Sequence, residues 1–205
     1  MKLQLALLLI LIGFSLQAQD SDLPNDFLSK DFHKERRTKL RTNLPNNSVA
    51  VFFANAVRNR ANDVEYVYHQ DPDFYYLTGY KEPDAVLFVF KEMQRAANGA
   101  NYNEILFVQP RNAQREMWTG RRLGEQGTKE VLGFQQAFNN SEFSRYNVDF
   151  AKFDKILFFD FNNDVRDNPR DSSDLYDLII QFKSKVKYQE KNAASLAVEP
   201  TKNNL

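Results

Sequence analysis

The side chains of this chain that could carry out chemistry are two histidines and a late group of aspartates. Carboxylates that gather in one place can hold magnesium, as in nucleases. The four aspartates are Asp160, Asp164, Asp167 and Asp171. Asn and Pro residues surround them, and this composition favours a solvated loop. A small hydrolase acting alone through Asp160 and its neighbours is therefore the least favoured interpretation.

The two histidines add little support for a hydrolase. A dinuclear metal site needs several carboxylates and at least one imidazole in one pocket. His33 lies among charged residues of a predicted helix, which favours a solvated position, and His69 has no second ligand at helical or hairpin spacing. Without Cys there is neither a disulfide nor a thiolate zinc site. We predict no catalytic residue, metal site or cofactor in this chain, and whether it belongs to an enzyme stays open at this point.

The elements that would position these residues follow from the apolar pattern. Short apolar runs predict strands over residues 49–54, 85–90, 105–108 and 155–160, and the Asn- and Ala-rich residues 94–103 predict a hairpin loop. Helices are predicted over 26–44, over 125–132, around 142–146 and late in the chain. The late helix would be capped by Ser172 or Ser173 and would bury Leu175, Leu178, Ile179, Phe182 and Val186. Interleaved strands and helices are typical of a layered α/β domain.

Composition agrees with a folded domain. Hydrophobic residues make up 42% of the chain, which is enough apolar surface for a core. The formal net charge is zero, so no basic surplus suggests nucleic acid as a partner.

The first residues predict an export signal. Lys2 precedes an apolar run from Leu3 to Leu16, and Gln17 begins a polar stretch. A run this short fits a signal peptide better than a bilayer span, and we place cleavage after Ala18. A permanent N-terminal anchor is the alternative. The expected organisation is a signal peptide (1–18), one domain (19–190) and the start of a linker (191–205), exported to the periplasm or the medium and not held in a membrane after cleavage.

Two longer motifs are the most specific feature of the chain. The first runs from Tyr68 to Val86, and the second, from Glu116 to Gly124, reads Glu-Met-Trp-Thr-Gly-Arg-Arg-Leu-Gly. Both resemble segments of the N-terminal domain of aminopeptidase P, the Xaa-Pro aminopeptidases, and the similarity extends over about residues 27–160. The chain departs from the family pattern at His69, where Arg is common, and at Pro72, where Ser is usual.

The resemblance implies a fold, and it implies that the catalytic residues lie in a separate domain. The fold is an α/β domain with a mixed sheet and flanking helices in a ribonuclease-H-like arrangement. In whole enzymes it precedes a separate catalytic domain. That domain holds two divalent metals, usually manganese, through two Asp, one His and two Glu, and it removes an N-terminal residue that precedes proline.

Candidate residues for an interface or a substrate rim come from the two motifs. They are His69, Gln70, Asp73, Tyr75, Trp118, Arg121 and Arg122. For Tyr75 a core position and a rim position are both open. Trp118 is expected to pack, and the two arginines either stay exposed or pair with carboxylates at a domain or subunit interface.

The resulting hypothesis is a non-catalytic N-terminal domain of an exported Xaa-Pro aminopeptidase that contributes to oligomerisation and active-site access. Its partners would be the catalytic domain of the same enzyme, further copies of the chain and short proline-containing peptides. The alternative is a freestanding secreted module that binds a peptide or a protein.

Overall fold

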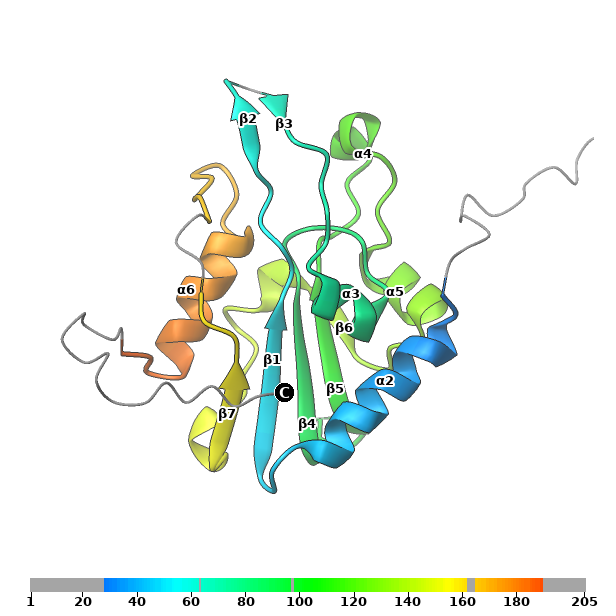
Figure 1. Ribbon diagram of the computed structural model, residues 1–205, viewed down its shortest axis with the longest axis vertical. Coiled ribbons are helices and arrows are strands. Elements are labelled where there is room, and N and C mark those ends of the chain that lie inside the picture. Colours follow the sequence, from blue (N-terminus) through cyan, green and yellow to red (C-terminus); the bar gives the residue numbers. More distant parts are fainter. Residues whose placement is uncertain (1–27, 63, 97, 162–164, 190–205) are drawn as a thin grey trace, which may run out of the picture.

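The computed structural model describes residues 28–189 except 63, 97 and 162–164. These residues form a five-stranded mixed sheet with helices on both faces, as predicted (Figure 1). The predicted signal peptide and linker lie outside the described residues. In the part of the chain that is described, no helix is long and apolar enough to cross a membrane.

The strand order of the sheet is β6-β5-β4-β1-β7. Its strands are β1 (Ser48–Phe53), β4 (Val86–Arg95), β5 (Asn101–Val108), β6 (Ala137–Asn139) and β7 (Lys155–Phe158). β4 is antiparallel to both β1 and β5, whereas β7 runs parallel to β1 and β6 runs parallel to β5. A separate hairpin of β2 (Asn59–Ala61) and β3 (Val64–Glu65) projects beyond the end of β1 (Figure 1).

Five helices and two short 3-10 turns complete the described chain. The helices are α2 (Lys30–Asn43), α3 (Pro72–Thr78), α4 (Ala113–Thr119), α5 (Gly124–Leu132) and α6 (Leu175–Lys185), and the turns are η2 (Asn140–Glu142) and η3 (Phe150–Lys152).

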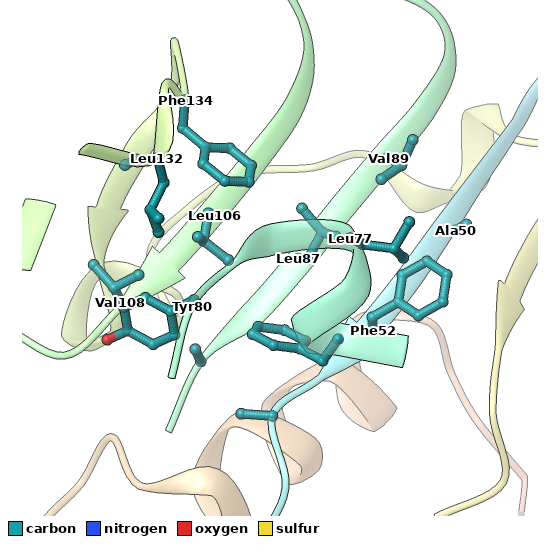
Figure 2. Packing of buried hydrophobic residues seen from close by; sticks show 14 of the residues in the cluster. Ala50, Phe52, Leu77, Tyr80, Leu87, Val89, Leu106, Val108, Leu132 and Phe134 are labelled. Atoms are coloured by element: carbon teal, nitrogen blue, oxygen red, sulfur yellow. The ribbon is translucent and has the colours of Figure 1, made fainter. Parts of the chain in front are cut away.

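Alternation along the strands divides the core into two layers. Successive side chains of a strand point to opposite faces of a sheet. Ala50 and Phe52 of β1 therefore join the layer that contains residues of α3 and α5 (Figure 2). Val49 and Val51 join the other layer, which contains Phe182 of α6. Because β1 is buried on both faces, its sequence from Val49 to Phe53 is an unbroken apolar run.

The inner face of α2 carries two buried polar side chains. Arg37 is fully buried and donates hydrogen bonds of 3.0 Å from Nε and Nη2 to the Glu104 carboxylate on β5. His33 is also fully buried, its Nδ1 lies 2.9 Å from the Tyr76 carbonyl oxygen, and burial lowers the pKa of the imidazole. The solvated position predicted for His33 is wrong, because the i, i+4 spacing places it on the same inward face as Arg37.

Three predicted boundaries are also corrected. β4 continues to Arg95 and β5 begins at Asn101, so much of the predicted loop 94–103 is strand. The helix expected around 142–146 is the 3-10 turn η2 followed by a turn. The cap of α6 is Asp174, whose carboxylate accepts a 3.0 Å hydrogen bond from the Asp177 amide, and is neither Ser172 nor Ser173.

Candidate functional site

The two motifs meet at one end of the sheet. β1, β5 and β7 end there and β4 begins there, so their connecting segments gather at that end (Figure 1). We name this end the rim, made of the described residues in 54–85, 109–123 and 159–174. The carboxyl ends of parallel strands are where open α/β sheets usually place their ligand sites.

Gln70 holds the first motif to the end of β1. Its Oε1 accepts hydrogen bonds of 2.8 Å from the Asn55 amide and from the Tyr68 hydroxyl. Its Nε2 donates to the carbonyl oxygens of Tyr80 and Glu82, at 3.3 Å and 2.9 Å. The amide of this candidate residue is therefore engaged inside the domain, where it holds the shape of the motif.

The two ends of α3, within the first motif, are formed by residue types that favour helix termini. The Asp71 carboxylate accepts a 2.8 Å hydrogen bond from the Phe74 amide at the start of the helix. Gly79 follows the last residue of the helix with φ of 72°, a left-handed conformation that glycine adopts without steric strain. A Cβ at Gly79 would lie 2.8 Å from the His33 ring, so this position also has no room for a side chain.

Glu82 connects the first motif to the second. Its Oε1 accepts a 2.7 Å hydrogen bond from the Leu123 amide, and its Oε2 accepts a 2.8 Å hydrogen bond from the Tyr80 hydroxyl. Burial raises the pKa of the Glu82 carboxyl, while the hydrogen bonds from Leu123 and Tyr80 oppose that rise. The Glu82 carboxylate thus links two rim segments by hydrogen bonds.

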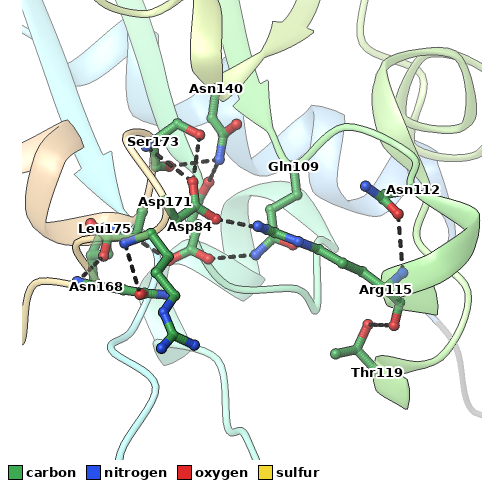
Figure 3. Close-up of polar contacts among 12 residues, drawn as sticks. Asp84, Gln109, Asn112, Arg115, Thr119, Asn140, Asn168, Asp171, Ser173 and Leu175 are labelled. Carbon is green, nitrogen blue, oxygen red and sulfur yellow. Dashed lines mark hydrogen bonds and ion pairs between the residues drawn. The ribbon is translucent and has the colours of Figure 1, made fainter. Parts of the chain in front are cut away.

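Asp84 connects the first motif to α6 and β5 (Figure 3). Its carboxylate accepts hydrogen bonds from the Leu175 amide at 3.0 Å and from Gln109 Nε2, and its carbonyl oxygen accepts one from Asn140. Burial raises the pKa of Asp84 from 3.8 to about 6. Its φ of 55° lies in the left-handed region, which Asp tolerates better than most residues.

Neither Glu82 nor Asp84 was among the sequence-derived candidates. The available signal was the pair of acidic residues around a proline, directly before the apolar run of β4. Acidic residues so close to a buried strand need internal partners.

The second motif carries the most exposed large apolar side chain of the rim, Trp118. Trp118 is 88% exposed and Met117 is 79% exposed, and no residue of α4 is buried. The expectation that Trp118 packs is therefore wrong within the described chain. α4 is too short and too polar to bury one of its faces. The Trp118 indole therefore projects from the rim.

The β2–β3 hairpin lies at the same end of the molecule (Figure 1), and apolar side chains in it and directly after it are exposed. Val64, Tyr66 and Val67 are 51%, 57% and 81% exposed. Exposed apolar residues that cluster at one end of a domain are typical of a surface that another protein covers.

The other candidates occupy different positions around the rim. His69, Asp73 and Arg121 are exposed, and Arg122 is half-buried. Arg122 is close enough to Glu82 for its charge to lower the pKa of that carboxyl, in opposition to the larger effect of burial.

Tyr75 lies partly in the core and partly at the rim, which are the two positions considered for it. Its ring lies 5.5 Å from the His33 ring in an edge-on arrangement, and Lys81 Nζ lies 5.7 Å from the ring centroid. The residue is half-buried, so one part packs on α2 and another part remains accessible.

The late aspartates that the structure describes lie in different environments. Asp171 pairs with Arg115 and accepts from Ser173, and Asp164 lies outside the described residues. Asp160 is exposed. Carboxylate oxygens of Asp167, Asp174 and Asp177 lie within 4.8 Å of one another, but Asp174 accepts hydrogen bonds from the backbone amides of Asn168 and Asp177. Asp174 thus already serves the backbone, and the group contains no histidine.

A cavity of about 230 Å³ lies between the ends of β1 and β7 and the start of α6. Its walls combine apolar side chains with three carboxylates, those of Asp71, Asp73 and Asp160. No histidine lines this cavity, so it does not provide the imidazole that a dinuclear hydrolase site needs.

Comparison with known proteins agrees with this geometry. The family model described as aminopeptidase P, N-terminal domain, matches residues 33–157. The Xaa-Pro aminopeptidase of Haemophilus influenzae is 35% identical over 117 residues, which are 57% of this chain and 26% of that protein. Intermediate cleaving peptidase 55 of Schizosaccharomyces pombe is 32% identical over 136 residues, which are 65% of this chain and 27% of that protein.

A solved structure of aminopeptidase P from Escherichia coli with the inhibitor Pro-Leu has the same fold. It superimposes with a TM-score of 0.55 at 32% identity and covers 64% of this chain and 29% of that one. The chain therefore spans little more than a quarter of the length of these relatives. By the match to its family model and by its fold, this chain belongs to the family of aminopeptidase P N-terminal domains.

Proposed function

We propose that this chain serves as the non-catalytic N-terminal domain of an Xaa-Pro aminopeptidase. Relatives that carry this activity in their names are about four times as long as the segment they share with this chain, so their remaining length leaves room for a catalytic domain. The carboxylates that converge among the described residues, those of Asp167, Asp174 and Asp177, include no imidazole, and Asp174 already accepts hydrogen bonds from two backbone amides. The role of the domain is then positional: it controls what reaches the reacting centre.

The exposed second motif is the observation that carries this proposal. Trp118 and Met117 lie on a helix without buried residues, inside the segment that matches the family model. Exposure of the Trp118 indole to water is unfavourable, and a partner that covers it would remove that cost. Aromatic residues are enriched in protein interfaces. We infer that the rim packs against the catalytic domain or against a second copy of the chain, where it narrows access to peptides.

Substrate class and cofactor follow from the same proposal. Short peptides with proline in the second position would pass a narrowed entrance, whereas long or folded chains would not. Manganese would be bound by the catalytic domain, whose metals would activate a water molecule for attack on the peptide bond.

The test is substitution of Trp118 in the full-length enzyme. We expect Trp118→Ala to raise KM for a short Xaa-Pro peptide, or to weaken assembly, by several-fold, because the side chain would be lost from an interface. Met93→Ala is the matched control, since Met93 is 62% exposed and lies near the end of β4 that is remote from the rim. Unchanged kinetics and unchanged size of the Trp118→Ala enzyme would contradict the proposal.

We also infer that the chain is exported. The support is the charged start at Lys2 and the short apolar run from Leu3 to Leu16. Mass spectrometry of the protein recovered from the periplasm or the medium should find a first residue near Gln19. A recovered protein that retains Lys2 would contradict cleavage and favour an anchor.

A further inference from the structure

α4 is joined to the rest of the described chain through one long-range ion pair. Arg115 Nη1 lies 2.7 Å from Asp171 Oδ2, and the two residues are 56 positions apart (Figure 3). The other hydrogen bonds described for α4 side chains stay within residues 111–122. They include the two contacts of Glu116 with Arg111, at 2.6 Å and 2.8 Å, and the bond from Thr119 to the Arg115 carbonyl oxygen.

Asp171 is well placed to act as an anchor. Its Oδ1 accepts hydrogen bonds from the amide and the hydroxyl of Ser173, at 3.2 Å and 3.0 Å, which leaves Oδ2 directed to Arg115. The side chain of Asp171 is 21% exposed, while that of Arg115 is 51% exposed. A carboxylate whose orientation is already set loses little conformational entropy when it pairs.

The turn that carries Asp171 is itself fastened to the core. Nδ2 of Asn140, a residue that is 3% exposed, donates hydrogen bonds to the carbonyl oxygens of Ser173 and Asp84, at 2.9 Å and 3.0 Å. The Asp84 carboxylate in turn accepts a hydrogen bond from the Leu175 amide. A continuous set of polar contacts therefore runs from the buried sheet to the surface helix (Figure 3).

We propose that Asp171 is a positioning residue for Trp118: by pairing with Arg115 it fixes the orientation of α4 and of the Met117–Trp118 face. The functional consequence rests on the proposed role of the rim as an interface. Asp171 lies outside residues 33–157, the part of the chain that matches the family model. The contact is therefore a feature of this chain that the family match does not supply.

Several physical observations support this assignment. No residue of α4 is buried, so apolar packing does not set its orientation. Burial alone would raise the pKa of Asp171, but hydrogen bonds from Arg115 and Ser173 bring it below its ordinary value. The Asp171 carboxyl is thus charged at neutral pH and holds a charged partner. Exposed ion pairs are weak, yet a weak contact shifts the orientation of a short helix that no buried side chain holds.

The test uses Trp118 itself as the reporter, because it is the only tryptophan in the sequence. Time-resolved fluorescence anisotropy of the full 205-residue chain separates fast local motion of the indole from tumbling of the whole protein. We expect Asp171→Asn to raise the amplitude of the fast component about two-fold, in line with the loss of an exposed ion pair. Asp154→Asn is the control, since it removes one charge from an exposed residue beside the start of β7, at the opposite end of the sheet.

A second variant separates the ion pair from the fold. Arg115→Gln removes the same contact and leaves the bonds between Asp171 and Ser173 intact. If the pair positions Trp118, the double variant should show no larger effect than either single one. An anisotropy decay of Asp171→Asn equal to that of Asp154→Asn, or additive effects of the two substitutions, would overturn the assignment. The measurement reads helix motion and not peptide cleavage, so its failure is distinguishable from failure of the proposed function.

Discussion

At the scale of single residues, two half-buried acidic residues hold the rim together. Glu82 and Asp84 flank one proline, yet each reaches a different segment: Glu82 binds the Leu123 amide and Asp84 binds the Leu175 amide. Burial raises the pKa of both carboxyls. A carboxylate in such a place is costly when charged, and hydrogen bonds offset part of that cost.

The raised pKa of Asp84 gives a pH-dependent free energy of unfolding. Because its folded value of about 6 exceeds 3.8, the folded state binds the proton more tightly than the unfolded state. The resulting stabilisation is fully present below the unfolded pKa and is lost as pH rises through the folded pKa, on the order of 2–3 kcal/mol. Asp84→Asn removes this titration, and its amide can donate to Gln109 Oε1, which has no partner at present.

Urea unfolding of Asp84→Asn and wild type at about pH 4.5 and about pH 8 tests this expectation. The variant should gain stability relative to wild type as pH rises. A difference that stays constant with pH would show that Asp84 does not titrate in this range. Asp154→Asn provides the control for loss of an exposed carboxylate.

At the scale of elements, α2 is attached to the sheet by a buried ion pair. Glu104 on β5 binds Arg37 and also Arg41, whose Nη2 lies 2.9 Å from the carboxylate. The Arg37 guanidinium also stacks over the Phe134 ring at 4.0 Å. A pair of this kind fixes how the helix lies on the sheet, although its net contribution to stability is small.

Removing one partner of this pair should be far more damaging than removing both. We expect Glu104→Gln to destabilise the domain by about 3 kcal/mol or more, because it leaves Arg37 charged and buried without its carboxylate. The double variant Arg37→Met with Glu104→Leu should recover a large part of that loss. Chemical denaturation measures both, with Glu35→Gln on the exposed face of α2 as the control. Equal losses for Glu104→Gln and Glu35→Gln would contradict a structural role for the pair.

The ends of α3 and α5 offer a matched comparison. Gly79 and Gly133 both follow their helices in the left-handed region, with φ of 72° and 73°. A Cβ at Gly79 would lie 2.8 Å from the His33 ring, whereas at Gly133 its nearest neighbour would be Lys30 Cδ at 3.4 Å.

Alanine at either glycine carries the cost of the left-handed backbone, about 1–2 kcal/mol. Gly79→Ala should cost about 1–3 kcal/mol more than Gly133→Ala, because it also overpacks a buried ring. Thermal or chemical unfolding of the two variants gives the difference directly. Equal destabilisation would mean that His33 can move aside at little cost.

At the scale of the whole molecule, the chain presents a mixed sheet with an apolar rim, and the converging carboxylates among its described residues are those of Asp167, Asp174 and Asp177. We expect the 205-residue chain to bind manganese only weakly and to leave short Xaa-Pro peptides uncleaved, because isolated carboxylates compete poorly with water for a divalent ion. Calorimetric titration with manganese followed by a peptide assay tests both. Stoichiometric sub-micromolar binding with metal-dependent release of the first residue would overturn this view.

Several features were already determined by the sequence. Apolar runs predicted β1, β4, β5 and the edge strand β7; for β1, burial on both faces explains the continuous run. The spacing from Leu175 to Phe182 predicted α6 because buried positions of a helix recur every three to four residues. The two motifs identified the family because their residues are tied to one another by contacts such as those of Gln70 and Glu82.

Tertiary structure alone decided which polar residues were buried. His33 and Arg37 belong to a strongly charged helix, and only its packing on β5 and α3 showed that this face is internal. Trp118, by contrast, is a large apolar residue of a type that is usually buried. It is exposed here because α4 contributes no residue to the core. Periodicity reports how apolar a face is, whereas burial of a charge depends on a partner distant in the chain. Glu104 lies 67 residues from Arg37, and no local pattern specifies that pairing.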